Sequence, residues 1–285
     1  MVVQGRYWRI LYVACATAVV LAVAFLTVLP AFDAVIMSAR RGAPLQAYRN
    51  TLHDPAFAPA VLTTIIYVIV TVPVQLLFGF LCAVHVYLAR RPLVWFTIYF
   101  LPYAVPVYAG VGAWRWMLDR RGYLATALSH FGVAPETWLG TRALATLCLV
   151  SVWCFAAFVF ASILARLYRI PAALHATAAT DGLSVGEWLR VVVWPQIKNT
   201  VVIVTVLRIA FMASKFDVPW LLVGSTSTAS GRTFTIFIAE RIGGDARGSV
   251  GVAAAVLLAG GLAVLFGLAS AILGRRALKE VRNAT

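Results

Sequence analysis

The chain has 285 residues, of which 62% are hydrophobic and only 12% are charged, and its formal net charge is +14. An ordinary soluble domain is roughly 45–50% apolar and about 25% charged, so this composition excludes both a soluble enzyme and a disordered chain. Basic residues that flank membrane helices and face anionic lipid headgroups explain the positive charge better than nucleic acid does. The composition therefore predicts an integral membrane protein that contacts lipid and has no nucleic-acid partner.

Long apolar runs predict an all-α fold of about six transmembrane helices, because one span needs roughly 20 apolar residues. In chain order the expected spans cover residues 10–32, 60–88, 92–116, 143–165, 200–223 and 249–274. Together they are expected to form one transmembrane domain over residues 1–285. An even number of spans places both termini on the same side of the membrane. The pairs Arg90-Arg91 and Arg275-Arg276 adjoin ends of spans on that side, which the positive-inside rule assigns to the cytoplasm.

The segment 166–199, between the fourth and fifth spans, has the pattern of a folded loop on the inner surface. Pro171 suits the first turn of a helix, Ala172–Thr180 favour a helix, and Asp181-Gly182 provides its end. Ser184 followed by Glu187 is a capping-box pattern that begins a second short helix. A folded inner loop on so small a membrane protein predicts that it docks a partner.

Motifs for chemistry on the chain itself are missing. There is no GxxxxGK[ST] phosphate loop, no HExxH motif, and no pair of cysteines with metal-ligand spacing. The four histidines, His53, His85, His130 and His175, are dispersed over different segments. We therefore expect no catalytic residue, cofactor or metal site on this chain, and no enzymatic activity.

Charged and aromatic residues within the expected spans leave two interpretations open. Arg208, Lys215 and Asp217 lie in the fifth span, where ionisable groups are costly and mark either interhelical ion pairs or a solute pathway. Aromatic residues at the ends of spans serve as interfacial anchors or as faces on which a solute binds.

The inner loop resembles the EAA loop of permease subunits of ATP-binding cassette (ABC) importers. It has Ile170-Pro171 at its start, Asp181-Gly182, and Pro195 about a dozen residues further on. Phe100-Leu101-Pro102 and Phe216-Asp217 are similar to the carbohydrate-uptake branch, especially to the first permease of the maltose or glycerol-phosphate type. The chain departs from the family where Ala176 replaces its glutamate and Thr177 its first alanine, so the usual acidic contact with the ATPase is either lost or supplied by another residue.

The resemblance implies a non-catalytic permease of a binding-protein-dependent importer, which forms half of a pathway for a sugar or related solute. It implies a second, homologous permease in a heterodimer, two cytoplasmic ATP-binding subunits that carry ATP and Mg²⁺, and an extracytoplasmic solute-binding protein. It also implies the bacterial cytoplasmic (inner) membrane as the location. The residues expected to couple to the ATPase are Pro171, Leu174, His175, Ala176, Thr177, Ala178, Asp181, Gly182 and Pro195. Those expected along the solute pathway are Tyr103, Tyr108, Trp114, Trp153, Phe216, Asp217 and Trp220.

The alternative is an ion-gradient-driven secondary transporter or a channel, and a membrane enzyme is a third hypothesis. Neither an inverted repeat nor several acidic residues deep in the spans supports the first alternative. The scattered histidines and glutamates disfavour an enzyme.

Overall fold

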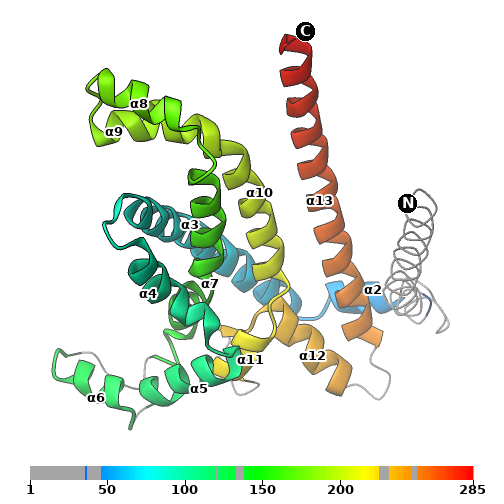
Figure 1. The fold of residues 1–285 in the computed structure, drawn as a ribbon. Helices are drawn as coiled ribbons and strands as arrows, with labels where there is room; N and C mark the ends of the chain where they lie inside the picture. Colours follow the sequence, from blue (N-terminus) through cyan, green and yellow to red (C-terminus); the bar gives the residue numbers. More distant parts are fainter. Residues whose placement is uncertain are drawn as a thin grey trace, which may run out of the picture. The chain divides into compact units, whose positions relative to one another are not determined.

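A computed structural model describes residue 36 and residues 46–119, 121–132, 138–224, 231–244 and 249–284, with side chains up to residue 271. Every regular element in these ranges is helical (Figure 1). The helices are α2 (Gln46–Leu52), α3 (Phe57–Leu88), α4 (Pro92–Ala104), α5 (Val107–Leu118), α6 (Tyr123–Ser129), α7 (Ala143–Leu167), α8 (Ala172–Thr180), α9 (Val185–Trp188), the π-helix η2 (Leu189–Val193), α10 (Trp194–Ala213), α11 (Asp217–Leu222), α12 (Phe234–Gly244) and α13 (Ser249–Ala284).

Four helices of the described part are long and apolar enough to cross a membrane, and five do so if the bent pair α4–α5 counts as one span. They correspond to the second to sixth expected spans. The first expected span, residues 10–32, lies outside the described residues. The prediction of an all-α membrane fold is confirmed for the residues that the structure covers.

By its internal contacts the chain divides into two compact units. The first comprises residues 1–54 and 238–260, and in it Arg241 forms an ion pair with Asp54 at an N···O distance of 2.7 Å. The second comprises residues 55–237 and 261–285, and it contains α3 to α11. The candidate functional residues all belong to the second unit.

The centre of the second unit is the pair α3 and α7, against which α4 and α10 pack. Gly79 permits the close approach of α3 to α7, because a Cβ atom at this position would lie 2.8 Å from the backbone nitrogen of Phe160. Buried residues of α7 run along its whole length, from Ala143 to Leu167. Figure 1 shows α8 and α9 at one end of α7 and α10, and α5 and α6 toward the other end.

The third expected span is bent by 85° between α4 and α5. The break lies at Val105 and Pro106, where both residues have extended ψ angles of 129° and 132°. Pro106 has no N–H to donate into a helix, and a residue that precedes proline is driven out of the α region. The third expected span is therefore two helices, α4 and α5, that meet at a sharp bend at these two residues.

The fifth expected span, residues 200–223, also differs from a single straight helix. A continuous helix of 29 residues runs from Val185 to Ala213 through α9, η2 and α10, so the second short helix of the loop is the first turn of this span. In η2 the N–H of Trp194 bonds to the carbonyl of Leu189, five residues back, next to Pro195. Proline cannot donate and crowds the carbonyl four residues before it, which a π-turn accommodates. The helix ends at Ser214, and the short α11 follows.

Candidate functional site: an exposed short helix and a cavity at a broken span

The helix α8 has the two ends that the sequence predicts. Pro171 precedes its first residue with φ −57° and ψ 134°, and Gly182 follows Asp181 with a positive φ of 67°. The N–H of Leu183 bonds to the carbonyl of Ala178 at 3.1 Å, and the N–H of Gly182 bonds to that of Ala179 at 3.2 Å. These two bonds form a Schellman motif, which requires the left-handed conformation that glycine adopts without strain.

Most of α8 is exposed. Of its nine residues only Ala178 is buried, while Leu174 is 39% exposed and Ala176 and Thr177 are exposed as well. Asp181, Gly182 and, in the next helix, Pro195 are also exposed. A folded helix with such a free surface is available for another molecule.

His175 differs from the other residues expected to couple, because its side chain is directed toward the bundle. One ring nitrogen, Nε2, lies 2.9 Å from the hydroxyl of Tyr87 at the end of α3. The other, Nδ1, accepts a hydrogen bond of 3.1 Å from the indole Nε1–H of Trp188 in α9. Sequence reasoning placed His175 on the docking surface and did not foresee these two partners.

The second part of the loop is held by its own capping box. The Ser184 hydroxyl accepts from the Glu187 N–H at 3.4 Å, and the Ser184 N–H donates to the Glu187 carboxylate at 2.9 Å. The prediction of a capping box at these residues is confirmed. Arg166 joins the end of α7 to this region through a hydrogen bond of 2.9 Å to the carbonyl of Gln196.

A cavity of about 400 Å³ lies at the bend between α4 and α5. Its wall consists of Pro102, Tyr103, Ala104, Val105, Pro106, Val107, Gly110, Trp153, Cys154, Phe155 and Lys215. Trp153 to Phe155 lie near the middle of the length of α7, and Tyr103, Ala104 and Pro106 on the opposite wall are exposed, so the cavity is open at the surface of the described chain. An aromatic wall, a cation and the end of a broken helix are the features of a site for a polar solute.

Some of the residues expected along the solute pathway lie in or next to this cavity. Tyr103 and Trp153 line it, and the Trp114 ring packs edge-on against Trp153 at 5.8 Å. Asp217 does not line it but forms an ion pair of 3.1 Å with Lys215, which does.

The remaining three aromatic residues expected along a pathway are absent from the cavity wall. Phe216 and Trp220 stack on each other at 5.4 Å. Tyr108 is 71% exposed.

A buried polar network next to this cavity was not foreseen. Arg208 is only 4% exposed, and its Nε–H donates to the side-chain oxygen Oε1 of Gln75 at 2.9 Å. Gln75 in turn donates to the Ser151 carbonyl at 3.0 Å, and the Ser151 hydroxyl lies 2.7 Å from that of Tyr67. Isolated polar residues inside apolar runs, such as Gln75 and Ser151, were the available signal for this network.

Of the three charged residues of the fifth expected span, Lys215 and Asp217 form a local ion pair, and Lys215 also lines the cavity. Arg208 forms no ion pair among the described residues, and its guanidinium faces the Phe155 ring at 5.5 Å. Lys215 pairs with Asp217 and also lies over the Phe155 ring at 4.3 Å. Both cations thus flank one aromatic ring of the cavity wall.

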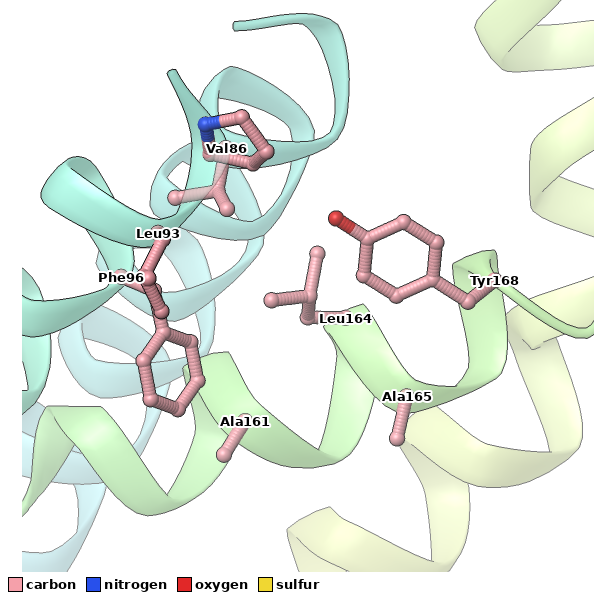
Figure 2. A pocket seen from close by; sticks show the side chains of 8 residues that line it. Val86, Leu93, Phe96, Ala161, Leu164, Ala165 and Tyr168 are labelled. Carbon is pink, nitrogen blue, oxygen red and sulfur yellow. The ribbon is translucent and has the colours of Figure 1, made fainter.

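A second cavity of about 420 Å³ has a different character (Figure 2). It is lined by Val86, Pro92, Leu93, Phe96, Ala161, Leu164, Ala165 and Tyr168, from α3, α4, α7 and the residue after α7. The Tyr168 hydroxyl is the one polar group among the side chains drawn in Figure 2, and it points into the space between α7 and Val86. A wall so poor in hydrogen-bonding groups does not fit a sugar-like solute.

No protein-family model matches the chain. In sequence it is 27% identical to a probable ABC transporter permease protein of Pyrococcus horikoshii over 62% of this chain and 63% of that protein. It is 26% identical to a sulfoquinovosyl glycerol transport system permease protein of Agrobacterium fabrum over 67% and 63% of the two chains. It is also 23% identical to a glucose import system permease protein of Saccharolobus solfataricus over 68% and 70%. The chain thus spans less than two thirds of the length of the first two relatives.

Solved structures show the same fold. A bacterial ABC transporter involved in the import of the acidic polysaccharide alginate matches with a TM-score of 0.80 at 19% identity, over 95% of this chain and 99% of that chain. The alginate transporter in complex with a periplasmic protein that holds an alginate pentasaccharide matches with a TM-score of 0.80 at 18% identity, over 93% and 94%. The resemblance of this chain to the permease subunits of ABC importers is therefore confirmed in sequence and in fold.

Proposed function

We propose that the chain is the permease subunit of an ABC importer and forms half of the translocation pathway for a sugar or a related solute. The observation that carries this proposal is the exposed helix α8, which ends in a Schellman motif and projects a free surface from the ends of α7 and α10. The relatives named for glucose and sulfoquinovosyl glycerol transport support the class of solute.

In this proposal α8 faces the cytoplasm and docks on a separate ATP-binding subunit, which holds ATP and Mg²⁺. Closure of two such subunits on ATP moves α8, and the spans change between inward-open and outward-open arrangements. The residues that contact the ATPase are Pro171, Leu174, Ala176, Thr177, Asp181, Gly182 and Pro195. The resemblance also implies Ala178, but its side chain is buried against the permease and does not belong to this surface. His175 belongs to the same helix and holds it in place. The permease itself is non-catalytic.

The other expected partners complete the proposed assembly. A second, homologous permease forms the other half of the pathway, and an extracytoplasmic binding protein delivers the solute. The complex lies in the bacterial inner membrane with both termini of this chain in the cytoplasm. The complex of the alginate transporter with its periplasmic protein supports such an arrangement.

The cavity at the broken span is the proposed place of solute binding. Tyr103 and Trp153 offer aromatic faces, and Lys215 offers a cationic hydrogen-bond donor. Discontinuous membrane helices are tolerated where they line such a cavity, and their free ends bind polar groups.

A co-purification experiment tests the docking role. The exposed Ala176 is changed to Arg in the chain co-expressed with its ATP-binding subunit, and Phe131, 83% exposed beyond α6 toward the other end of α7, is changed to Arg as the control. We expect A176R to lose the ATPase from the purified complex and F131R to retain it. Solute uptake by the isolated permease in liposomes, driven by an ion gradient without any ATPase, would contradict the proposal and favour a secondary transporter.

A further inference from the structure

The helix α8 has little packing of its own. Only Ala178 is buried among its nine residues, and the helix is joined to the chain by turns at Pro171 and Gly182. A short helix without a buried face has no intrinsic reason to keep one orientation, because most helical stability in proteins comes from tertiary packing. Some other contact must hold α8 if a force applied to it is to reach the spans.

His175 makes that contact through both of its ring nitrogens. The indole N–H of Trp188 can only donate, so the Nδ1 atom of His175 accepts and carries no proton. In the neutral imidazole the proton is then on Nε2, which donates to the Tyr87 hydroxyl. Two bonds on opposite sides of one ring fix its plane and its rotation.

Ring contacts strengthen this arrangement. The Tyr87 and Trp188 rings are nearly parallel, at 17° with centroids 6.0 Å apart, and His175 lies 5.7 Å from the first and 5.8 Å from the second. Tyr87 is the penultimate residue of α3, which packs along α7, and Trp188 is the last residue of α9, in the first turn of the continuous helix that becomes α10. These three residues, called here the aromatic latch, therefore join α8 to two spans.

We propose that His175 is the positioning residue of the coupling helix, and that the aromatic latch of Tyr87, His175 and Trp188 transmits displacement of α8 to α3 and α10. The inference rests on the proposed function, since it names the residues through which a movement of α8, caused by the ATPase, reaches the membrane-spanning helices. At the position where the resemblance implies a glutamate that contacts the ATPase, this chain has Ala176. The preceding residue, His175, forms hydrogen bonds with other residues of the permease.

Tyr168 provides a matched control. Its ring packs against that of Tyr87 at 5.5 Å, but its hydroxyl makes no hydrogen bond among the described residues and points into the apolar cavity (Figure 2). A Tyr168→Phe change therefore removes the same atom as Tyr87→Phe without breaking the latch.

The experiment uses the full transporter, with both permeases, the ATPase and the binding protein, in liposomes. ATP hydrolysis and uptake of the solute are measured separately for Tyr87→Phe, Trp188→Phe, both together, and Tyr168→Phe. We expect each latch variant to assemble and hydrolyse ATP but to take up about fivefold less solute per ATP, the factor that one net hydrogen bond is worth. The double variant should be little worse than either single one, because the two bonds act on one ring.

The Tyr168→Phe variant should take up as much solute per ATP hydrolysed as the wild type. Latch variants that couple normally would overturn the inference, and so would variants that lose assembly or ATP hydrolysis in parallel with uptake, because such a loss marks a merely structural role. Neither result would contradict the proposed function, which is tested separately by whether the wild-type complex shows ATP-dependent uptake.

Discussion

The Nε–H of Arg208 in α10 donates to the side-chain oxygen of Gln75 in α3 across 2.9 Å, although the two residues are 133 positions apart in the chain. Arg208 as a whole is 4% exposed and has no carboxylate partner among the described residues. A buried cation in a span is costly unless its donors are satisfied, so this amide is an essential partner of the charge.

Gln75→Leu should therefore destabilise the bundle by about 2 kcal/mol, the scale of a lost hydrogen bond to a charged group. The measurement is the melting temperature of the detergent-solubilised permease. The double change Gln75→Leu with Arg208→Met serves as the control, because removal of both partners leaves no unsatisfied charge. We expect the double variant to recover most of the lost stability, and simple addition of the two single effects would contradict the coupling.

Gly79→Ala should weaken the contact between α3 and α7. The added Cβ atom would come within 2.8 Å of the Phe160 nitrogen and of Val159, and backbone cannot move aside as a flexible side chain can. We expect a loss of about 1–3 kcal/mol, as is typical of overpacking, again by thermal melting. Gly112→Ala in α5 is the matched change, since nothing lies within 4 Å of its Cβ position. It should be neutral or slightly stabilising, and an equal loss at both sites would refute the argument from close approach.

Gly182→Ala should loosen α8 at its C-terminal end. A left-handed φ of 67° costs an alanine roughly 1–2 kcal/mol, whereas Gly186 has no positive φ and no neighbour near its Cβ position. Hydrogen exchange of the amides of Ala172–Thr180 measures the effect. Exchange should be at least about fivefold faster in Gly182→Ala and unchanged in Gly186→Ala. Equal protection in both variants would show that the Schellman motif does not hold the helix.

Trp153→Leu should raise the KM for solute uptake about tenfold, because one aromatic contact is worth roughly 0.5–1.5 kcal/mol beyond its buried area. ATP-binding subunits should still co-purify, since Trp153 lies in the cavity and away from α8. Trp95→Leu is the matched control, because Trp95 packs on His85 and Tyr99 and does not line the cavity. If both changes raise KM equally, the cavity is not the solute site.

Local signals predicted much of this structure. Apolar runs located the spans because a helix is the one way to satisfy their backbone in lipid, and Pro171 and Gly182 located α8 because each residue imposes its own backbone conformation. The capping box at Ser184 followed from side chains three residues apart.

Contacts between distant segments could not be predicted in the same way. The sequence shows Pro102 and Pro106, but the 85° bend depends on what packs around them. Likewise, nothing near His175 in the chain indicates that Tyr87, 88 residues earlier, is its partner. In a short helix with a weak hydrophobic pattern, such as α8, the sequence does not distinguish the exposed residues from those that face the bundle.

The joint at Val105 and Pro106 has a consequence for the solute specificity of the proposed permease. The last carbonyl groups of a helix have no partner inside it, and here residues Pro102 to Val105 border the cavity. Hydroxyl-rich molecules can bond to these main-chain oxygens, which mutation of a side chain does not delete. In the proposed function, the surrounding aromatic residues can therefore change and alter the preference among sugars, while the main-chain oxygens still bind polyhydroxylated solutes.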